Sequence, residues 1–260
     1  MSEVTYPLAD RRSQWFENRY PGVVSRPQVV VLHTTEGRTW NDYQDGAVAP
    51  TLTVMPLPQT RRLIWRQHYS VNRAARALRA TAEGPTNNRG AIQVEMVGTC
   101  SKTGPGYYWP KANEWALQGI ADFLAWVNQE WSVPLVAAKG WPDYPSSPAI
   151  DRATRLSMKS WLAFRGVCGH LHVPGNTHLD PGAFPIETVL GLARAKAVQE
   201  DDMPLTDAEI AKIASAVWGA QFGGSAAGAR ETAGQRLAQA ASQQDLAALE
   251  ARLTAAMKGS

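Results

Sequence analysis

The chain has 260 residues and a mass of 28.3 kDa, enough to bury a substantial core, so we expect one large domain with an appendage. The net charge of +3 is unevenly divided: residues 1–199 carry 21 Lys and Arg against 15 Asp and Glu, and residues 200–260 carry 5 against 8. No apolar stretch approaches the roughly 20 residues that a membrane helix needs, and no nucleic-acid recognition signature accompanies the arginines, so membrane insertion and nucleic-acid binding are not expected.

The start of the chain lacks the basic-then-apolar order of a signal peptide, and synthesis in a cytoplasm is therefore expected. The only two cysteines, Cys100 and Cys168, fit that compartment as reduced, buried thiols.

The first half of the chain predicts several strands. Residues 29–32, Val-Val-Val-Leu, are typical of a buried strand, and His33 closes it. Residues 51–55 and 63–65 predict two more strands, with the prolines at 56 and 58 breaking the chain between them. Residues 91–98 alternate between apolar and polar side chains, which predicts a central strand carrying Glu95.

Helices and a further strand follow. Apolar residues recur at helical spacing over 111–131 and predict an amphipathic helix ended by Pro134. Ser157 is a plausible N-cap for a short helix through residue 164, and residues 165–169 would form the last strand. A helix is expected from residue 186 to about 199. Strands that alternate with helices indicate an α/β fold, with a central mixed sheet flanked by helices.

The tail has a different character. An acidic hinge near residue 200 leads to a capping box at Thr206 and Glu209, a glycine-rich break at 223–228 and about two heptads of apolar residues near the end. We expect a domain over 1–199, with a core at about 25–195, and a helical tail over 200–260. Either the tail mediates oligomerisation, partner docking or targeting, or it packs back on the domain.

Residues 168–182 have the composition of a metal site. This Pro- and Gly-rich segment holds three of the five histidines and Asp180. His170 and Asp180 lie ten residues apart across a loop that can fold back on itself. Together with His33 they would give zinc two imidazoles and one carboxylate, leaving the fourth position to water, as a catalytic site requires. His172 is an alternative to His170, because the two would share a face of an extended strand.

These motifs together resemble a known family. A strand ending in His-Thr-Thr, a strand reading Ile-Gln-Val-Glu, and Gly-His followed ten residues later by Asp-Pro-Gly are similar to the type-2 N-acetylmuramoyl-L-alanine amidases. These enzymes share the peptidoglycan recognition protein fold, and the resemblance is strongest to amidase domains of endolysins from phages of actinobacteria. It covers about residues 25 to 195.

The resemblance implies a role for each site residue. His33, His170 and Asp180 would hold one Zn²⁺, Glu95 would be the catalytic glutamate, and His178 would steady the transition state. The substrate would be peptidoglycan, cleaved at the amide between N-acetylmuramic acid and the L-alanine of the stem peptide. The candidate substrate-binding residues come from the arginine-rich stretch 61–89 and from nearby aromatic positions: Arg73, Arg76, Trp65 and Tyr108.

The same chemistry follows from the residue types. An amide hydrolase needs a proton acceptor that returns the proton to the departing nitrogen, which suits Glu95, and a donor to the oxyanion, which suits His178. We therefore expect a zinc-dependent endolysin, made in the host cytoplasm and reaching the cell wall through a separate membrane pore. Two alternatives stay open: a non-catalytic peptidoglycan-binding module, and a metallopeptidase that cuts within the stem peptide.

Overall fold

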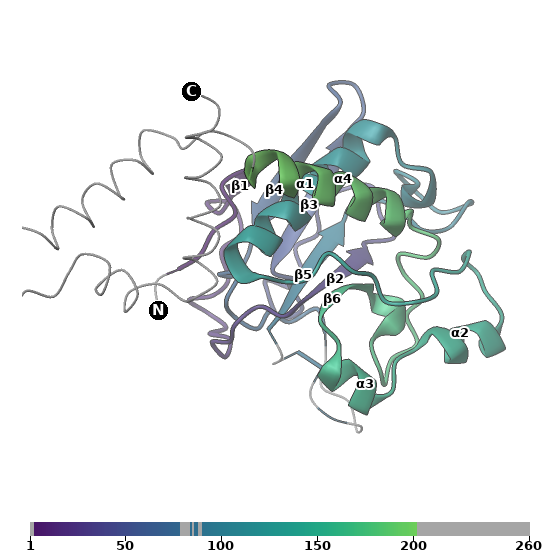
Figure 1. The fold of residues 1–260 in the computed structure, drawn as a ribbon. Helices are drawn as coiled ribbons and strands as arrows, with labels where there is room; N and C mark the ends of the chain where they lie inside the picture. The colour runs from purple at the N-terminus through teal and green to yellow at the C-terminus, as the bar shows by residue number, and fades with distance from the viewer. Residues whose placement is uncertain (1–2, 79–83, 85, 88–89, 202–260) are drawn as a thin grey trace, which may run out of the picture. The chain divides into compact units, whose positions relative to one another are not determined.

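The computed structural model describes residues 3–78, 84, 86–87 and 90–201 (Figure 1). The chain divides into two units, residues 1–196 and 197–260. The predicted capping box, glycine-rich break and heptads of the tail lie outside the described residues. Within the described part of the chain, no helix is both long and apolar enough to cross a membrane.

A six-stranded mixed sheet forms the centre of the first unit, in the order β1-β4-β3-β5-β2-β6. The pair β3 and β4 is antiparallel and the other neighbours are parallel. This arrangement confirms the predicted α/β class with a central mixed sheet. The strands are β1 Ala9–Asp10, β2 Val29–Thr34, β3 Leu52–Leu57, β4 Arg62–Gln67, β5 Ala91–Met96 and β6 Gly166–Gly169.

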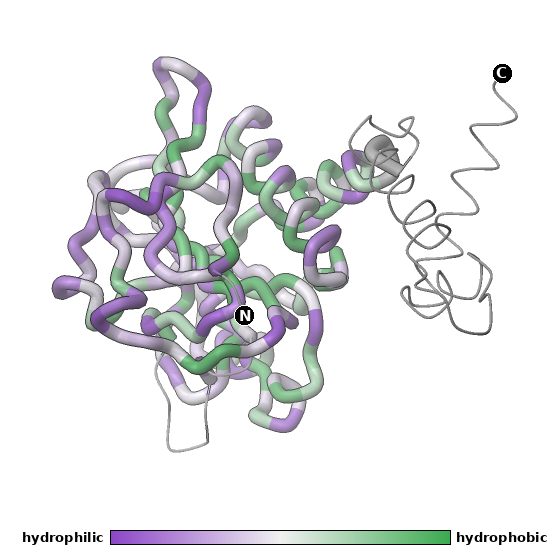
Figure 2. The backbone as a smooth tube through the Cα atoms, turned by 90° about the vertical axis from the view of Figure 1, so that its left-hand side faces the viewer, coloured by the Kyte–Doolittle hydropathy of each residue, from purple (hydrophilic) through white to green (hydrophobic). Residues whose placement is uncertain are grey.

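Helices cover the sheet on both faces. The helices α1 (Glu114–Trp131) and α4 (Ile186–Asp201) pack on the face that carries Ile92, Val94 and Met96 of β5, and Figure 1 shows them side by side over the strands. On the other face, Trp161 of α3 (Met158–Ala163) packs with Val29 and Val31 of β2. The central strands are accordingly hydrophobic and the outer loops hydrophilic (Figure 2). The remaining helices are α2 (Pro148–Thr154) and the 3-10 turns η1 (Trp109–Lys111) and η2 (His170–His172).

Local chemistry explains several boundaries. The Ser157 side chain accepts a hydrogen bond from the backbone N–H of Ser160, which confirms the predicted cap of α3. Helix α1 ends at Trp131 as predicted, where Ser132 takes a left-handed conformation with φ of 57°, but it begins at Glu114 and not at Lys111, which lies in η1. Cys100 and Cys168 are both buried and unpaired.

One expectation about the elements is wrong, and two elements were not expected. Pro56 does not break the chain but lies inside β3, where it pairs with Leu63. A proline is tolerated there because β5 pairs with β3 only as far as Val54, so no ladder partner on that side needs the missing N–H. Helix α2 was not expected, although Ser147 as N-cap and Pro148 at the first helical position are its signal. The two-residue strand β1 is too short to leave a periodic pattern.

Candidate metal centre

His33 and Glu95 are neighbours across two parallel strands. The register of β2 and β5 pairs them directly, and the next pair in the same register is Thr34 with Met96. Residues in register point to the same face of a sheet, so both side chains lie on the face opposite α1. The His33 Nδ1 is 3.9 Å from Glu95 Oε1, and the His33 side chain is 1% exposed. A buried imidazole and a carboxylate are thus placed together at the carboxyl end of the sheet.

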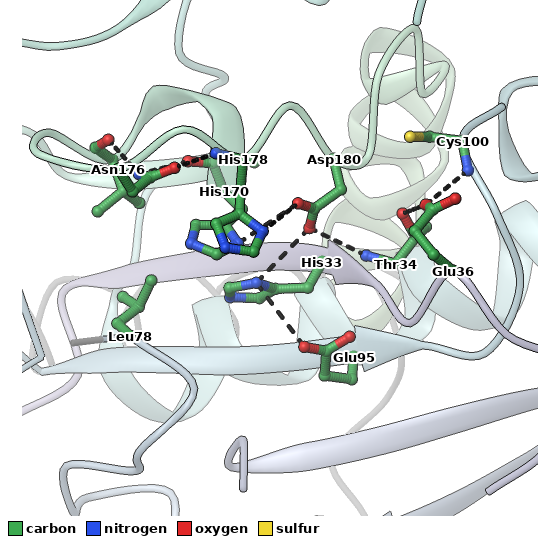
Figure 3. Close-up of polar contacts among 12 residues, drawn as sticks. His33, Thr34, Glu36, Leu78, Glu95, Cys100, His170, Asn176, His178 and Asp180 are labelled. Atoms are coloured by element: carbon green, nitrogen blue, oxygen red, sulfur yellow. Dashed lines mark hydrogen bonds and ion pairs between the residues drawn. The ribbon is translucent and has the colours of Figure 1, made fainter. Parts of the chain in front are cut away.

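The loop after β6 brings His170 and Asp180 onto this pair (Figure 3). The backbone N–H of Thr34, next to His33, donates to Asp180 Oδ2 at 3.2 Å. Asp180 Oδ2 lies 3.7 Å from His33 Nδ1, and Asp180 Oδ1 lies 3.4 Å from His170 Nδ1. One candidate ligand atom from each of these three residues lies within 4.8 Å of the other two. The predicted ligand set, drawn from segments far apart in the chain, converges on one point.

The geometry and chemistry of the three groups fit a tetrahedral metal ion. Ligand atoms held at the usual N and O distances from zinc are roughly 3.3 to 3.4 Å apart, which the 3.4 Å between His170 Nδ1 and Asp180 Oδ1 matches, and the three groups need to close by a few tenths of an ångström to an ångström or so elsewhere. The Nε2 atom of His33 is buried and has no hydrogen-bond partner within the described part of the chain. The other ring nitrogen, Nδ1, faces the cluster at 3.7 Å from Asp180 Oδ2 and is the atom that would bind a metal ion.

The electrostatics of His33 and Asp180 favour the protonation states that a metal requires of them. Burial lowers the pKa of His33 to about 3, helped by His170 and opposed by Asp180, so the ring is neutral at pH 7. For Asp180, burial acts to raise the pKa, but the imidazoles of His170, His178 and His33 together hold it well below its usual range. Neutral imidazoles and an ionised carboxylate are the forms that bind zinc.

Unlike Asp180, Glu95 has a pKa above its ordinary value. Burial raises the pKa of its carboxyl group to about 8, and the negative charges of Asp180 and Glu36 act in the same direction. Its Oε2 is buried without a hydrogen-bond partner among the described residues. A carboxylate with a raised pKa and a free oxygen is suited to accept a proton and give it back. A nearby cation would offset the charge of Asp180 and lower the pKa of Glu95 towards neutrality.

His178 lies at the outer side of the cluster. Its ring stacks on that of His170, with centroids 4.3 Å apart and an angle of 14° between the planes. Its Nδ1 is 3.6 Å from Asp180 Oδ1, and its side chain is 63% exposed. The ring therefore reaches solvent from the rim of the site, where it is able to donate a proton or a hydrogen bond to a bound substrate.

A turn gives His170 and His172 different surroundings. Both residues lie in η2, a 3-10 turn, and not on the extended strand that would place them on one face. His172 Nδ1 accepts a hydrogen bond from the backbone N–H of Gly169, and Nε2 lies 2.7 Å from the carbonyl oxygen of Gly140. Burial lowers the pKa of His172 to about 4. Its ring is used by the backbone, which leaves His170 as the candidate ligand.

Two residues that we did not single out from the sequence shape the loop. The Asn176 side chain accepts from the backbone N–H of His178 at 2.7 Å and donates to the carbonyl of His170 at 3.4 Å. Arg155 donates to the carbonyls of Val173 and His178, each at 3.0 Å. The Asn in the loop was a signal for such a turn, whereas nothing near Arg155 in the sequence points to this role.

Trp65, which we expected to contact substrate, lies in the core. Trp65 is 3% exposed and packs between Tyr6 and Phe123 on the α1 face, so its predicted contact with substrate is wrong. The alternation along β4 was too short to show which side chains face the core.

The two candidate arginines are bound within the protein. Arg73 forms an ion pair with Glu17 at 2.7 Å and donates to the carbonyl of Gly22. Arg76 donates to the carbonyl of Ala47 and stacks on the Tyr20 ring. Arg73 is therefore engaged in holding loops together, whereas Arg76 is exposed and donates through Nε alone, so its predicted role in substrate binding stays a prediction.

A groove of about 390 Å³ runs beside the cluster. Met55 and Leu57 line it, both on the same face of β3 as Thr53, which pairs with Glu95. Val97 and Tyr107 also line it. Tyr108 is half-buried next to this groove and forms a bridge with Thr99, so its predicted role stays a prediction. The groove gives an extended ligand a partly apolar surface on the same face of β3 as Thr53.

Comparisons with known proteins find structural similarity without sequence similarity. No protein-family model matches the sequence, and no curated protein matches it. The hydrolase AmiA of Staphylococcus aureus, solved with its ligand, is 16% identical with a TM-score of 0.43, over 76% of this chain and 86% of that one. The N-acetylmuramoyl-L-alanine amidase LysC of Clostridium intestinale is 10% identical with a TM-score of 0.42, over 72% and 97%. A structure of AmpD is 15% identical with a TM-score of 0.42, over 75% and 97%.

These identities and TM-scores are too low to assign the chain to a family or to an activity. The interpretation of the site therefore rests on its own residues: a buried His-His-Asp group that is able to hold a metal ion, with Glu95 and His178 beside it.

Proposed function

We propose that this protein is a zinc-dependent peptidoglycan hydrolase that cleaves the amide between N-acetylmuramic acid and the L-alanine of the stem peptide. The observation that carries the proposal is the convergence of His33, His170 and Asp180 on one point beside a buried glutamate of raised pKa. The sequence motifs at these positions, with their resemblance to type-2 amidases, support the choice of substrate.

The residues divide the chemistry among themselves. A zinc ion bound to the three ligands would act as a Lewis acid on the amide carbonyl and lower the pKa of a water molecule towards about 7. Glu95 takes a proton from the attacking water as the new C–O bond forms. It then gives that proton to the nitrogen as the C–N bond breaks, which releases the amine and a carboxylic acid.

His178 completes this division of labour at the rim of the site. Its exposed imidazole donates to the carbonyl oxygen as negative charge develops there. Removing one such donor costs roughly 3 kcal/mol of transition-state stabilisation in enzymes of this kind. The stacking of His178 on His170 fixes the plane of the ring, so little reorganisation is needed during the reaction.

Digestion of purified cell walls by zinc-loaded protein tests the proposal. Mass analysis should find free lactyl groups on muramic acid, paired with new L-alanine amino termini, and a chelator should abolish both. New D-amino-acid termini with intact sugar–peptide links would identify a metallopeptidase instead. Binding to the walls without any product would identify a non-catalytic binding module.

The biological setting belongs to the same proposal. We propose an endolysin that lyses the host of a phage, made in the host cytoplasm and released to the wall through a separate membrane pore, with the tail of residues 200–260 as an oligomerisation or targeting element. Light scattering of the full chain and of a form that stops near residue 198 tests the role of the tail. A dimer seen only with the full chain is the expected result if the tail mediates oligomerisation.

A further inference from the structure

A row of polar residues crosses the sheet through the candidate catalytic pair. The strand registers place His33 of β2 next to Glu95 of β5, Glu95 next to Thr53 of β3, Thr53 next to Arg66 of β4, and Arg66 next to Asp10 of β1. Because residues in register share a face, all five side chains leave the sheet on the side of the metal centre. Strand spacing puts Arg66 about 10 Å from Glu95 and about 14 Å from His33 along this row.

Arg66 is held in place by an aromatic ring. Its guanidinium carbon lies 3.9 Å from the centroid of the Trp40 ring, and both residues are half-buried. Trp40 comes seven residues after His33, so the same connection that leaves the metal centre supplies the ring. Stacking uses the flat face of a guanidinium and leaves its edge, with the N–H donors, free to bind a planar anion in a bidentate manner.

The part of the chain that the structure describes supplies no anion for this guanidinium. Among the described residues, Arg66 makes no hydrogen bond or ion pair through its side chain, unlike Arg73 with its ion pair to Glu17. Its neighbour in the row, Asp10, is bound to Arg12 and Ser13 instead. A positive charge fixed on the site face without a counter-ion is an unfilled anion-binding position.

We propose that Arg66, seated on Trp40, is a specificity-determining residue that binds a carboxylate of the substrate's peptide. The inference rests on the proposed function. An extended peptide covers about 3.3 to 3.6 Å per residue, so the 10 to 14 Å from the reacting groups to Arg66 corresponds to roughly three to four residues beyond the scissile amide. Stem peptides carry carboxylates on the second residue, on a diaminopimelate third residue and at the carboxyl terminus, and the distance matches the last two, one of which Arg66 binds.

Soluble muramoyl peptides test the inference on the zinc-loaded full chain. Four substrates are compared: one with all carboxylates, one amidated at the second residue, one with lysine as the third residue, and one amidated at the terminus. Charge-assisted hydrogen bonds predict that Arg66→Gln lowers kcat/KM about 10- to 100-fold on the first substrate, mostly through KM. Arg66→Lys keeps the positive charge but loses the two parallel N–H donors of the guanidinium, so its kcat/KM should lie between those of the wild type and Arg66→Gln. Arg152→Gln, an exposed helix residue, is the control and should change nothing.

The decisive comparison is between the wild type and Arg66→Gln on the substrate that lacks the carboxylate bound by Arg66. For one amidated or lysine-containing substrate, the wild type should fall to the level of Arg66→Gln, and the substitution should cause no further loss. An equal loss on all four substrates would show that Arg66 only maintains the structure, and no loss on any would refute its contact with substrate.

Binding separates this inference from the proposed function. Calorimetric titration of the same peptides into Glu95→Gln protein measures affinity without turnover. If the wild type hydrolyses none of the substrates, the proposed function fails, while affinity that depends on both Arg66 and one carboxylate would still support the inference. Peptide affinity that does not change when Arg66 is replaced would overturn the inference.

Discussion

Replacing Glu95 by glutamine should separate the stability of the metal-free protein from its activity. The folded carboxyl group has a pKa of about 8, whereas the ordinary value for a glutamate is 4.5. Between these two pH values the unfolded chain has released the proton and the folded chain has not, so the free energy of unfolding falls as the pH rises through this window. At 1.36 kcal/mol per pKa unit, the loss is about 3 kcal/mol at pH 7 and approaches about 5 kcal/mol above pH 8. Glu95→Gln removes that loss, because the amide does not ionise.

Urea unfolding of chelator-treated protein measures this effect. The difference in unfolding free energy between Glu95→Gln and the wild type should grow by about 3 kcal/mol from pH 4.5 to pH 7. The control is Glu36→Gln, which should lower stability at pH 7 because the Glu36 carboxylate accepts hydrogen bonds from Thr34, Thr99 and Cys100. With zinc bound, Glu95→Gln should lose about 10²- to 10⁴-fold in kcat and retain the metal.

Two results would refute this reasoning. A stability difference that does not change with pH would mean that Glu95 is not buried in an environment that disfavours its charge. Loss of zinc from Glu95→Gln, measured by elemental analysis, would mean that Glu95 is a ligand and not a base.

Three further substitutions test the surroundings of the site. Burial lowers the pKa of His68 to about 4, so protonating this ring should cost the protein about 3 kcal/mol of stability as the pH falls from 6.5 to 4. His68→Gln should remove that loss in urea unfolding, and a variant with the same pH profile as the wild type would contradict this prediction. His172→Phe should retain zinc but lower the free energy of unfolding by about 2 kcal/mol or more, because the buried backbone groups of Gly140 and Gly169 lose their hydrogen-bond partner. Loss of zinc from this variant would show that His172 is a ligand. Asn176→Ala should weaken zinc binding at least about tenfold in a competition titration, and an unchanged affinity would show that the loop holds its shape without this side chain.

Much of the fold and the ligand set could be predicted because short-range patterns carried them. The apolar run before His33 is continuous since β2 is buried on both faces, and the alternation around Glu95 fixed which face that side chain takes. The ten-residue spacing of His170 and Asp180 is enough for a loop to return, which the hydrogen bond from Leu171 N–H to the Asp180 carbonyl now confirms.

The rest depended on pairings that no local pattern contains. His172 looked like a second ligand because a 3-10 turn of three residues has no periodicity to read. Trp65 and Arg66 are adjacent in sequence but lie on opposite faces of β4, and only the register with β3 shows that Arg66 shares the face of Glu95. Ion pairs such as that of Arg73 with Glu17 likewise join residues more than fifty positions apart.

The most direct test is a crystal structure of the zinc-loaded full chain, with anomalous diffraction at the zinc edge. We expect one zinc ion per chain, about 2.0 to 2.2 Å from a nitrogen of His33, a nitrogen of His170 and an oxygen of Asp180, with Glu95 outside the coordination sphere. An ion bound elsewhere, or no anomalous peak at this cluster under conditions of excess zinc, would contradict the account.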